Sequence, residues 1–286
     1  MKTSSNEWAK FIAAPELGMQ GLHAYFNKHQ YERHSHDYYV LGTIDAGAPK
    51  VALENSSFIA PAGSAMIINP GDSHDGKACG DQGYLYSMVY VEPWAIADIA
   101  GEFGVSTPAS ILFTRSVVTD PDVVFALRRL HRTLFYGQDR LAAEIHLIEA
   151  LKPLLTRYST RPATLRAKAH DPRIERVREL IHACFADSLT TADMADAAGL
   201  SRVRLNQLFR AAYGLPLHAY LNGVRLEAAK KLLASGLPSA GVAASVGLFD
   251  QSHLIRRFKG CFGITPAQFV DAHFPVVQYG TSSSLP

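Results

Sequence analysis

The sequence predicts an α+β multidomain protein: a β-barrel with flanking helices, then an all-α domain with two helix-turn-helix units joined by a long helix. Three observations predict this fold. Short alternating apolar runs dominate residues 22–91, helical periodicity dominates from residue 93 onward, and one helical pattern occurs twice after residue 190. The chain has 286 residues, 48% of them hydrophobic, which suits two packed cores and excludes a disordered chain.

Charge is divided unevenly along the chain. Residues 1–160 contain 13 Lys and Arg against 17 Asp and Glu, a net charge of −4, whereas residues 161–286 contain 15 against 9, a net charge of +6. The overall charge of +2 hides this division. An acidic half joined to a basic half predicts two domains with different partners.

The sequence gives no sign of export or of membrane insertion. The first twenty residues lack the apolar core of a signal peptide, and no stretch approaches the ~20 apolar residues of a membrane helix. Cys79, Cys184 and Cys261 are far apart and lack CxxC spacing, so we expect free thiols. The expected location is the cytoplasm, with no membrane partner.

The N-terminal domain is expected to span residues 1–155 and to begin with antiparallel strands. Its alternating apolar runs are separated by Gly, Pro and Asn-Ser, which supply turn chemistry. The clearest predicted strands are Tyr38–Ile44, Lys50–Leu53, Ala65–Ile68 and Tyr84–Val91. Strands of this kind form a sandwich or a barrel.

Helices are predicted between residues 93 and 158. Pro93 suits the start of a helix, where its missing N–H costs nothing. A shorter helix runs through Val124 and Leu134 and ends near Gly137. The next helix has an apolar stripe formed by Leu141, Ile145, Ile148, Leu151, Leu155 and Tyr158. These helices either only cover one face of the β-domain or also use part of the stripe as a dimer interface.

The rest of the chain divides into a linker, a helical domain and a tail. Residues 156–172 are polar, contain two prolines and lack an apolar stripe, as a linker does. Residues 173–274 are helical almost throughout, and residues 275–286 are expected to form a flexible tail.

A repeat lies within the helical domain. The pattern Ala-x3-Gly, followed by Phe-x4-Gly, occurs from Ala195 to Gly214 and again from Ala243 to Gly263. In the first copy, Thr190 and Asp193 suit a capping box, and Gly199 suits a left-handed turn between two helices. The two copies predict two helix-turn-helix units, joined by one long helix over 216–235.

The outward faces of the repeated second helices suit DNA. Such a helix lies in the major groove, where Arg, Gln and Asn read base edges. The residues expected to face outward are Arg202, Asn206, Gln207 and Arg210 in the first unit, and Gln251, Ser252, Ile255 and Arg256 in the second. A helical bundle with a polar surface is the alternative, but two copies in a basic half favour DNA binding.

The stretch Val242–Phe269, VAASVGLFDQSHLIRRFKGCFGITPAQF, resembles the signature of the AraC/XylS family of bacterial transcription regulators. The first copy of the repeat and the joining helix are similar to the same family, and the resemblance covers about Arg173–Phe269. It implies a seven-helix DNA-binding domain that binds promoter or operator DNA. It also implies a homodimer and a contact with RNA polymerase.

The resemblance implies particular DNA contacts by position. The base-reading residues would be Val203, Asn206, Gln207, Gln251, Ser252, Ile255 and Arg256. The apolar members of this set would touch only thymine methyl groups or sugar. The phosphate contacts would come from Arg202, Arg210, Arg257 and Lys259, which give an affinity that falls with salt.

Three histidines stand out in the acidic half. His34 and His36 are two residues apart, and His74 closes the segment Pro70-Gly71-Asp72-Ser73-His74. Two His at this spacing on a strand point the same way, and a third on a facing strand can complete a metal site. The pattern resembles the two motifs of the cupin barrel and the arabinose-type sensor domain of AraC-family regulators. Metal-binding cupins carry a Glu shortly after the first motif, which residues 37–41 lack.

The favoured interpretation is a small-molecule effector pocket, with a metal site and purely structural histidines as alternatives. The expected effector-binding residues are His34, His36, His74, Tyr38 and Tyr39. Strand alternation lets only one of the two tyrosines face inward. We assign no metal, no cofactor and no catalytic residue, because no catalytic motif such as GxSxG or HExxH is present.

The predicted function is therefore a sequence-specific transcription regulator controlled by an effector in the N-terminal barrel. It is not expected to be an enzyme. The alternative is a cupin-type metal-dependent enzyme fused to a helical domain.

Overall fold

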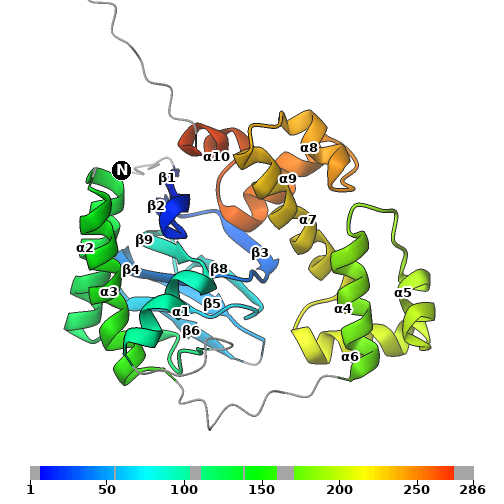
Figure 1. The fold of residues 1–286 in the computed structure, drawn as a ribbon, viewed down its shortest axis with the longest axis horizontal. Helices are drawn as coiled ribbons and strands as arrows, with labels where there is room; N and C mark the ends of the chain where they lie inside the picture. The colour runs from blue at the N-terminus through cyan, green and yellow to red at the C-terminus, as the bar shows by residue number, and fades with distance from the viewer. Residues whose placement is uncertain (1–6, 55, 104–110, 138, 160–170, 274–286) are drawn as a thin grey trace, which may run out of the picture.

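The computed structural model describes residues 7–54, 56–103, 111–137, 139–159 and 171–273 (Figure 1). Most of the predicted linker and all of the predicted tail lie outside these residues. Within them, a β-rich N-terminal domain is followed by an all-α domain. This confirms the predicted fold class.

Two antiparallel sheets form the N-terminal domain. The larger contains, in spatial order, β1 (Trp8–Ala14), β2 (Met19–Phe26), β9 (Tyr84–Val91), β4 (Tyr39–Gly47), β7 (Ala65–Ile68) and β10 (Val117–Val118). The smaller contains β3 (Gln30–His34), β8 (His74–Ala78), β5 (Pro49–Ala52) and β6 (Ser57–Ile59). A single 3-10 turn, Pro15–Leu17, joins β1 to β2. The arrangement is compatible with a cupin-like jelly roll, although the strands form two sheets instead of one closed barrel.

The predicted strands lie close to the observed ones. β7 and β9 have the predicted bounds, whereas β4 begins one residue later and ends three residues later than predicted. β4 is buried on both faces over its first six residues. Tyr39 and Leu41 pack toward the helices, and Val40 packs on the opposite side of the sheet.

Three helices cover the outer face of the larger sheet. They are α1 (Pro93–Glu102), α2 (Pro121–Tyr136) and α3 (Arg140–Arg157). Asp120 and Asp139 accept hydrogen bonds from backbone N–H groups at the starts of α2 and α3. Pro93 occupies the first turn of α1, as predicted.

The predicted stripe of α3 is only partly buried. Its buried face contains Ala143, Leu147, Ala150 and Leu154, whereas Leu141 and Ile145 are 62% and 45% exposed. The first half of the predicted stripe is therefore exposed, whereas Leu151 and Leu155 in its second half are buried. Small alanines occupy the packed face there, and the larger side chains lie at the surface.

Seven helices form the described part of the C-terminal domain, as the family resemblance implied. They are α4 (Pro172–Cys184), α5 (Thr191–Ala198), α6 (Arg202–Tyr213), α7 (Leu217–Ala234), α8 (Ser239–Ser245), α9 (Gln251–Phe262) and α10 (Pro266–His273). The helix-turn-helix units are α5–α6 and α8–α9, and α7 joins them (Figure 1).

Local signals account for the turns of both units. Thr190 and Asp193 form the predicted capping box, and Asp250 accepts a hydrogen bond from the backbone N–H of His253. Gly199 has a φ of 63°, a conformation that costs a residue with a side chain considerable strain. The capping box and the turn at Gly199 were predicted from the sequence.

The C-terminal domain packs directly on the N-terminal one. Helix α9 lies against β3, and α10 lies against β1, where the rings of Phe11 and Phe269 are 5.3 Å apart. Gly260 faces the Glu32 side chain at this contact, and a Cβ at position 260 would lie 2.8 Å from it. One continuous apolar cluster includes side chains from the sheets and from α7 to α10.

Candidate functional site

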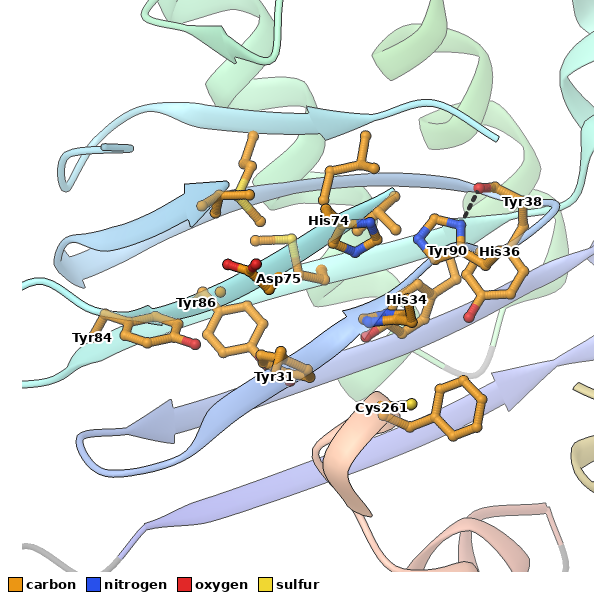
Figure 2. Close-up of a pocket in the computed structure, with 17 residues that line it drawn as sticks. Tyr31, His34, His36, Tyr38, His74, Asp75, Tyr84, Tyr86, Tyr90 and Cys261 are labelled. Carbon is orange, nitrogen blue, oxygen red and sulfur yellow. Dashed lines mark hydrogen bonds between the residues drawn. The ribbon is translucent and has the colours of Figure 1, made fainter. Parts of the chain in front are cut away.

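A pocket lies between the two sheets and against the C-terminal end of α9 (Figure 2). Three histidines, five tyrosines and Asp75 supply most of its polar groups, and Val40, Met66, Ile68 and Met88 are among its apolar lining residues. Figure 2 shows the histidines with Tyr38 and Tyr90 at one end, and Tyr31, Tyr84 and Tyr86 at the other. An apolar cavity with a few placed polar groups is the usual form of a small-molecule site.

Local structure brings the three histidines together. His34 is the last residue of β3 and pairs with His74, the first residue of β8. His36 follows in the loop before β4, where its carbonyl accepts a hydrogen bond of 2.8 Å from the N–H of Gly71. The prediction that the third histidine lies close to the first pair holds, although it lies on a neighbouring strand of the same sheet.

Backbone carbonyls orient all three imidazoles. The Nδ1 atoms of His34, His36 and His74 lie 2.7, 2.8 and 2.9 Å from the carbonyl oxygens of residues 32, 38 and 72. A carbonyl oxygen only accepts, so each Nδ1 carries a proton and donates. Each Nε2 is then left with its lone pair.

Burial keeps these imidazoles neutral. It lowers the pKa of His34 and lowers that of His74 to about 3. Burial also lowers the pKa of His36 well below its ordinary value, and the neighbouring His74 and His34 add to the shift. The pocket therefore presents neutral ring nitrogens and not cations.

Of the two adjacent tyrosines, Tyr38 faces the pocket and Tyr39 does not. The Tyr38 ring stacks on His36, with centroids 4.2 Å apart, and it lines the pocket. Tyr39 points to the opposite side of the sheet, where its hydroxyl donates to the carbonyl of Ile111 at 2.6 Å. The assignment of Tyr39 to the effector site was therefore wrong, because the pleat of β4 turns it into the helix-covered core.

The C-terminal domain contributes to the same pocket. Cys261 and Phe262, at the end of α9, line it directly. At its rim the Tyr38 hydroxyl donates to Glu227 at 3.3 Å, and Lys230 donates to the same hydroxyl at 3.4 Å. None of these four C-terminal residues was predicted as part of the site.

Of these four residues, Lys230 is the one that the sequence could have indicated. Lys230 occupies a position on α7 in phase with Leu226 and Leu233, and its side chain is 9% exposed. It lies 4.6 Å from the centre of the Tyr38 ring. A lysine on the inward stripe of a helix indicates a polar neighbour across the interface.

The predicted DNA-contacting residues lie on the exposed sides of α6 and α9. All of the predicted base-reading residues, from Val203 to Arg256, are exposed, and so are Arg202, Arg210 and Lys259. Arg257 differs, because its Nη1 lies 2.7 Å from the Glu32 carboxylate of β3. Phe249, in the turn before α9, is 92% exposed and was not predicted.

A β-sandwich with an internal pocket, joined to two helix-turn-helix units, defines a ligand-binding, DNA-binding regulator. Two family profiles match the chain: an AraC-like ligand binding domain over residues 16–155 and a helix-turn-helix domain over residues 194–272. No described helix is long and apolar enough to cross a membrane.

Similar proteins support the same class. The HTH-type transcriptional regulator YbfI of Bacillus subtilis is 26% identical over 87% of this chain and 90% of its own. The arabinose operon regulatory protein of Salmonella typhimurium is 28% identical over 93% of this chain and 89% of its own. The fold is shared with fatty acid-bound ToxT of Vibrio cholerae, with a TM-score of 0.55 and 13% identity over 96% of this chain and 99% of that one. The chain belongs to the AraC family of transcription regulators.

Proposed function

We propose that an effector bound between the two sheets controls DNA binding through the position of α9. The carrying observation is that α9 has expected base-reading residues at its start and pocket-lining residues at its end. The helix has 12 residues and behaves as one rigid element about 18 Å long. An effector that displaces Phe262 therefore moves Gln251 and Arg256 as well.

The Arg257–Glu32 pair supports a docked state that binds DNA weakly. Arg257 is one of the expected phosphate contacts, and in this structure its guanidinium is held by the sensor domain. A guanidinium that donates to a carboxylate has its charge partly neutralised, which weakens its attraction for a phosphate. Effector binding would shift the population between the docked state and one that is free to bind DNA.

Gel-shift titration against the promoter next to its own gene tests the proposal. We expect Glu32→Gln to bind DNA about two- to fivefold more tightly than the wild type, because a partly exposed ion pair contributes up to ~1 kcal/mol. Glu16→Gln, at an exposed acid remote from α9, serves as the matched control. If the wild type forms a complex with no sequence preference and no salt dependence, sequence-specific DNA binding is refuted. If the two variants bind DNA with equal affinity, the proposed role of the Arg257–Glu32 ion pair is refuted.

Our proposal includes a homodimer that acts in the cytoplasm and contacts RNA polymerase at the promoter. Four large apolar side chains on α2 and α3 support the dimer, because each is at least 45% exposed: Phe125, Tyr136, Leu141 and Ile145. Light scattering of Ile145→Asp is expected to give the mass of one chain. Asp98→Lys, on the exposed side of α1, should leave the mass of the wild type unchanged.

A further inference from the structure

We propose that His34, His36 and His74 bind one divalent transition-metal ion through their Nε2 atoms. The ion would lie at the histidine end of the pocket and keep at least one coordination position open toward its interior. This inference goes beyond the regulatory proposal, because it concerns the sensor domain alone and is measured without DNA.

The separations of the three rings suit a shared ion. One ring nitrogen from each residue lies within 4.8 Å of the others, and all three side chains are buried. Around an ion about 2.1 Å from each Nε2, the ring centroids of two ligands lie about 4.5–5.3 Å apart. The observed centroid separations are 4.4 Å for His34 and His74, 5.0 Å for His36 and His74, and 5.9 Å for His34 and His36. A modest inward rotation of the His36 ring completes the geometry.

The hydrogen bonds of the rings are those of metal ligands. Metal-binding histidines usually donate their second N–H to a carbonyl or carboxylate, which fixes the tautomer and the ring orientation. All three Nδ1 atoms do so here, and the three carbonyls come from the backbone, which holds them rigidly. The nitrogen that remains on each ring is the one that can bind the ion.

An unsatisfied atom points to a missing partner. His36 is 3% exposed, and its Nε2 has no hydrogen-bond partner among the described residues. A buried lone pair without a partner is unfavourable, so a native protein normally supplies one. A bound metal ion satisfies this nitrogen and the two beside it together.

The rest of the pocket determines the coordination. Val40, within the segment where a metal-binding cupin carries its Glu, presents an apolar side chain to the pocket. The nearby carboxylate of Asp75 pairs with Arg33 at 3.3 Å. Three neutral imidazoles suit zinc, cobalt, nickel, copper or ferrous iron, and they leave the full charge of the ion to attract an oxygen donor of a ligand.

Cobalt titration of the full-length protein, untagged and stripped of metal, tests the site directly. We expect one Co²⁺ per chain and the visible absorption of a four- or five-coordinate complex, with three imidazole nitrogens detected by X-ray absorption of the loaded wild type. Zn²⁺ should compete for the same site and raise the Tm. No stoichiometric binding, or fewer than three nitrogens, would overturn the proposal.

Variants locate the ion within the chain. We expect His36→Gln and His74→Gln each to weaken Co²⁺ binding at least tenfold. His131→Gln is the matched control, because His131 is also buried with an Nε2 that lacks a partner in the described structure, but it lies against the helix-covered face. Circular dichroism establishes that each variant is folded. Equal affinity in all three variants contradicts the assignment, as does a loss in His131→Gln alone.

Discussion

The two helix-turn-helix units have the same local design but different surroundings. The first, α5–α6, packs with α4 and the start of α7 in a core of its own that contains Phe209. The second, α8–α9, shares a continuous core with the β-domain through Phe258 and its neighbours. Two copies of one motif therefore differ in how directly they contact the N-terminal domain.

A single position of the repeat illustrates the difference. Leu208 precedes Phe209 in the first unit and packs against its own core, whereas Arg257 precedes Phe258 in the second and reaches Glu32 on β3. The first unit touches the sensor mainly at the end of α6, where the Ser73 hydroxyl donates to the carbonyl of Gly214 at 3.3 Å. Control by an effector should therefore act first on the second unit.

The largest expected effect compares the two buried phenylalanines. Phe209→Ala and Phe258→Ala should each cost about 3–5 kcal/mol, the usual effect of deleting a buried aromatic side chain. Hydrogen exchange should show faster exchange confined to α4–α6 in the first variant, and spread over α8–α10 and β1–β3 in the second. Identical exchange patterns would break the comparison between the units.

The next largest effect is a loss of folding stability at low pH, which should affect the two helix-turn-helix units differently. Burial lowers the pKa of His131, packed against β2, from an ordinary value of about 6.5 to about 4. The folded state therefore keeps a neutral imidazole, and stability present above pH 6.5 is lost as the pH falls toward 4, by about 2–3 kcal/mol.

The control for this prediction is His131→Gln, which should lose less stability than the wild type over the same pH range. Hydrogen exchange measured at about pH 6.5 and at about pH 4 should show α8–α10 opening together with the β-domain, because these helices share its core. Opening of α4–α6 before α8–α10 would contradict the shared core.

A smaller effect is expected at the DNA surface. Gln207→Ala on α6 and Arg256→Ala on α9 should each weaken specific binding by about 1–3 kcal/mol, the value of a good base contact. Gel shifts at fixed salt measure the loss, and Lys77→Ala, on an exposed strand of the sensor, should bind normally. If only Gln207→Ala has an effect, the second unit does not read bases.

Much of the fold could be predicted from the sequence because its signals are local. Short apolar runs between turn residues placed β7 and β9, and the capping residue Thr190 placed the start of α5. The phase of α3 was predicted less well, since apolar side chains such as Leu141 occur on its exposed side as well.

Only part of the candidate site could be predicted from such local signals. His34, His36 and His74 could be grouped because the spacing of the first two histidines and the later segment that ends in His74 form a recognisable sequence pattern. The choice between Tyr38 and Tyr39 depended on which face of β4 the helices cover, and this is a property of the packed layers.

The sequence by itself determined the two repeated DNA-binding units, the β-rich domain and its cluster of histidines, because periodicity, capping and turn residues act over a few positions. The tertiary structure decided that Phe262 and Lys230 reach the pocket and that Arg257 pairs with Glu32. These residues meet partners about two hundred positions away. Such contacts depend on how two packed domains fit together, and no local pattern encodes that fit.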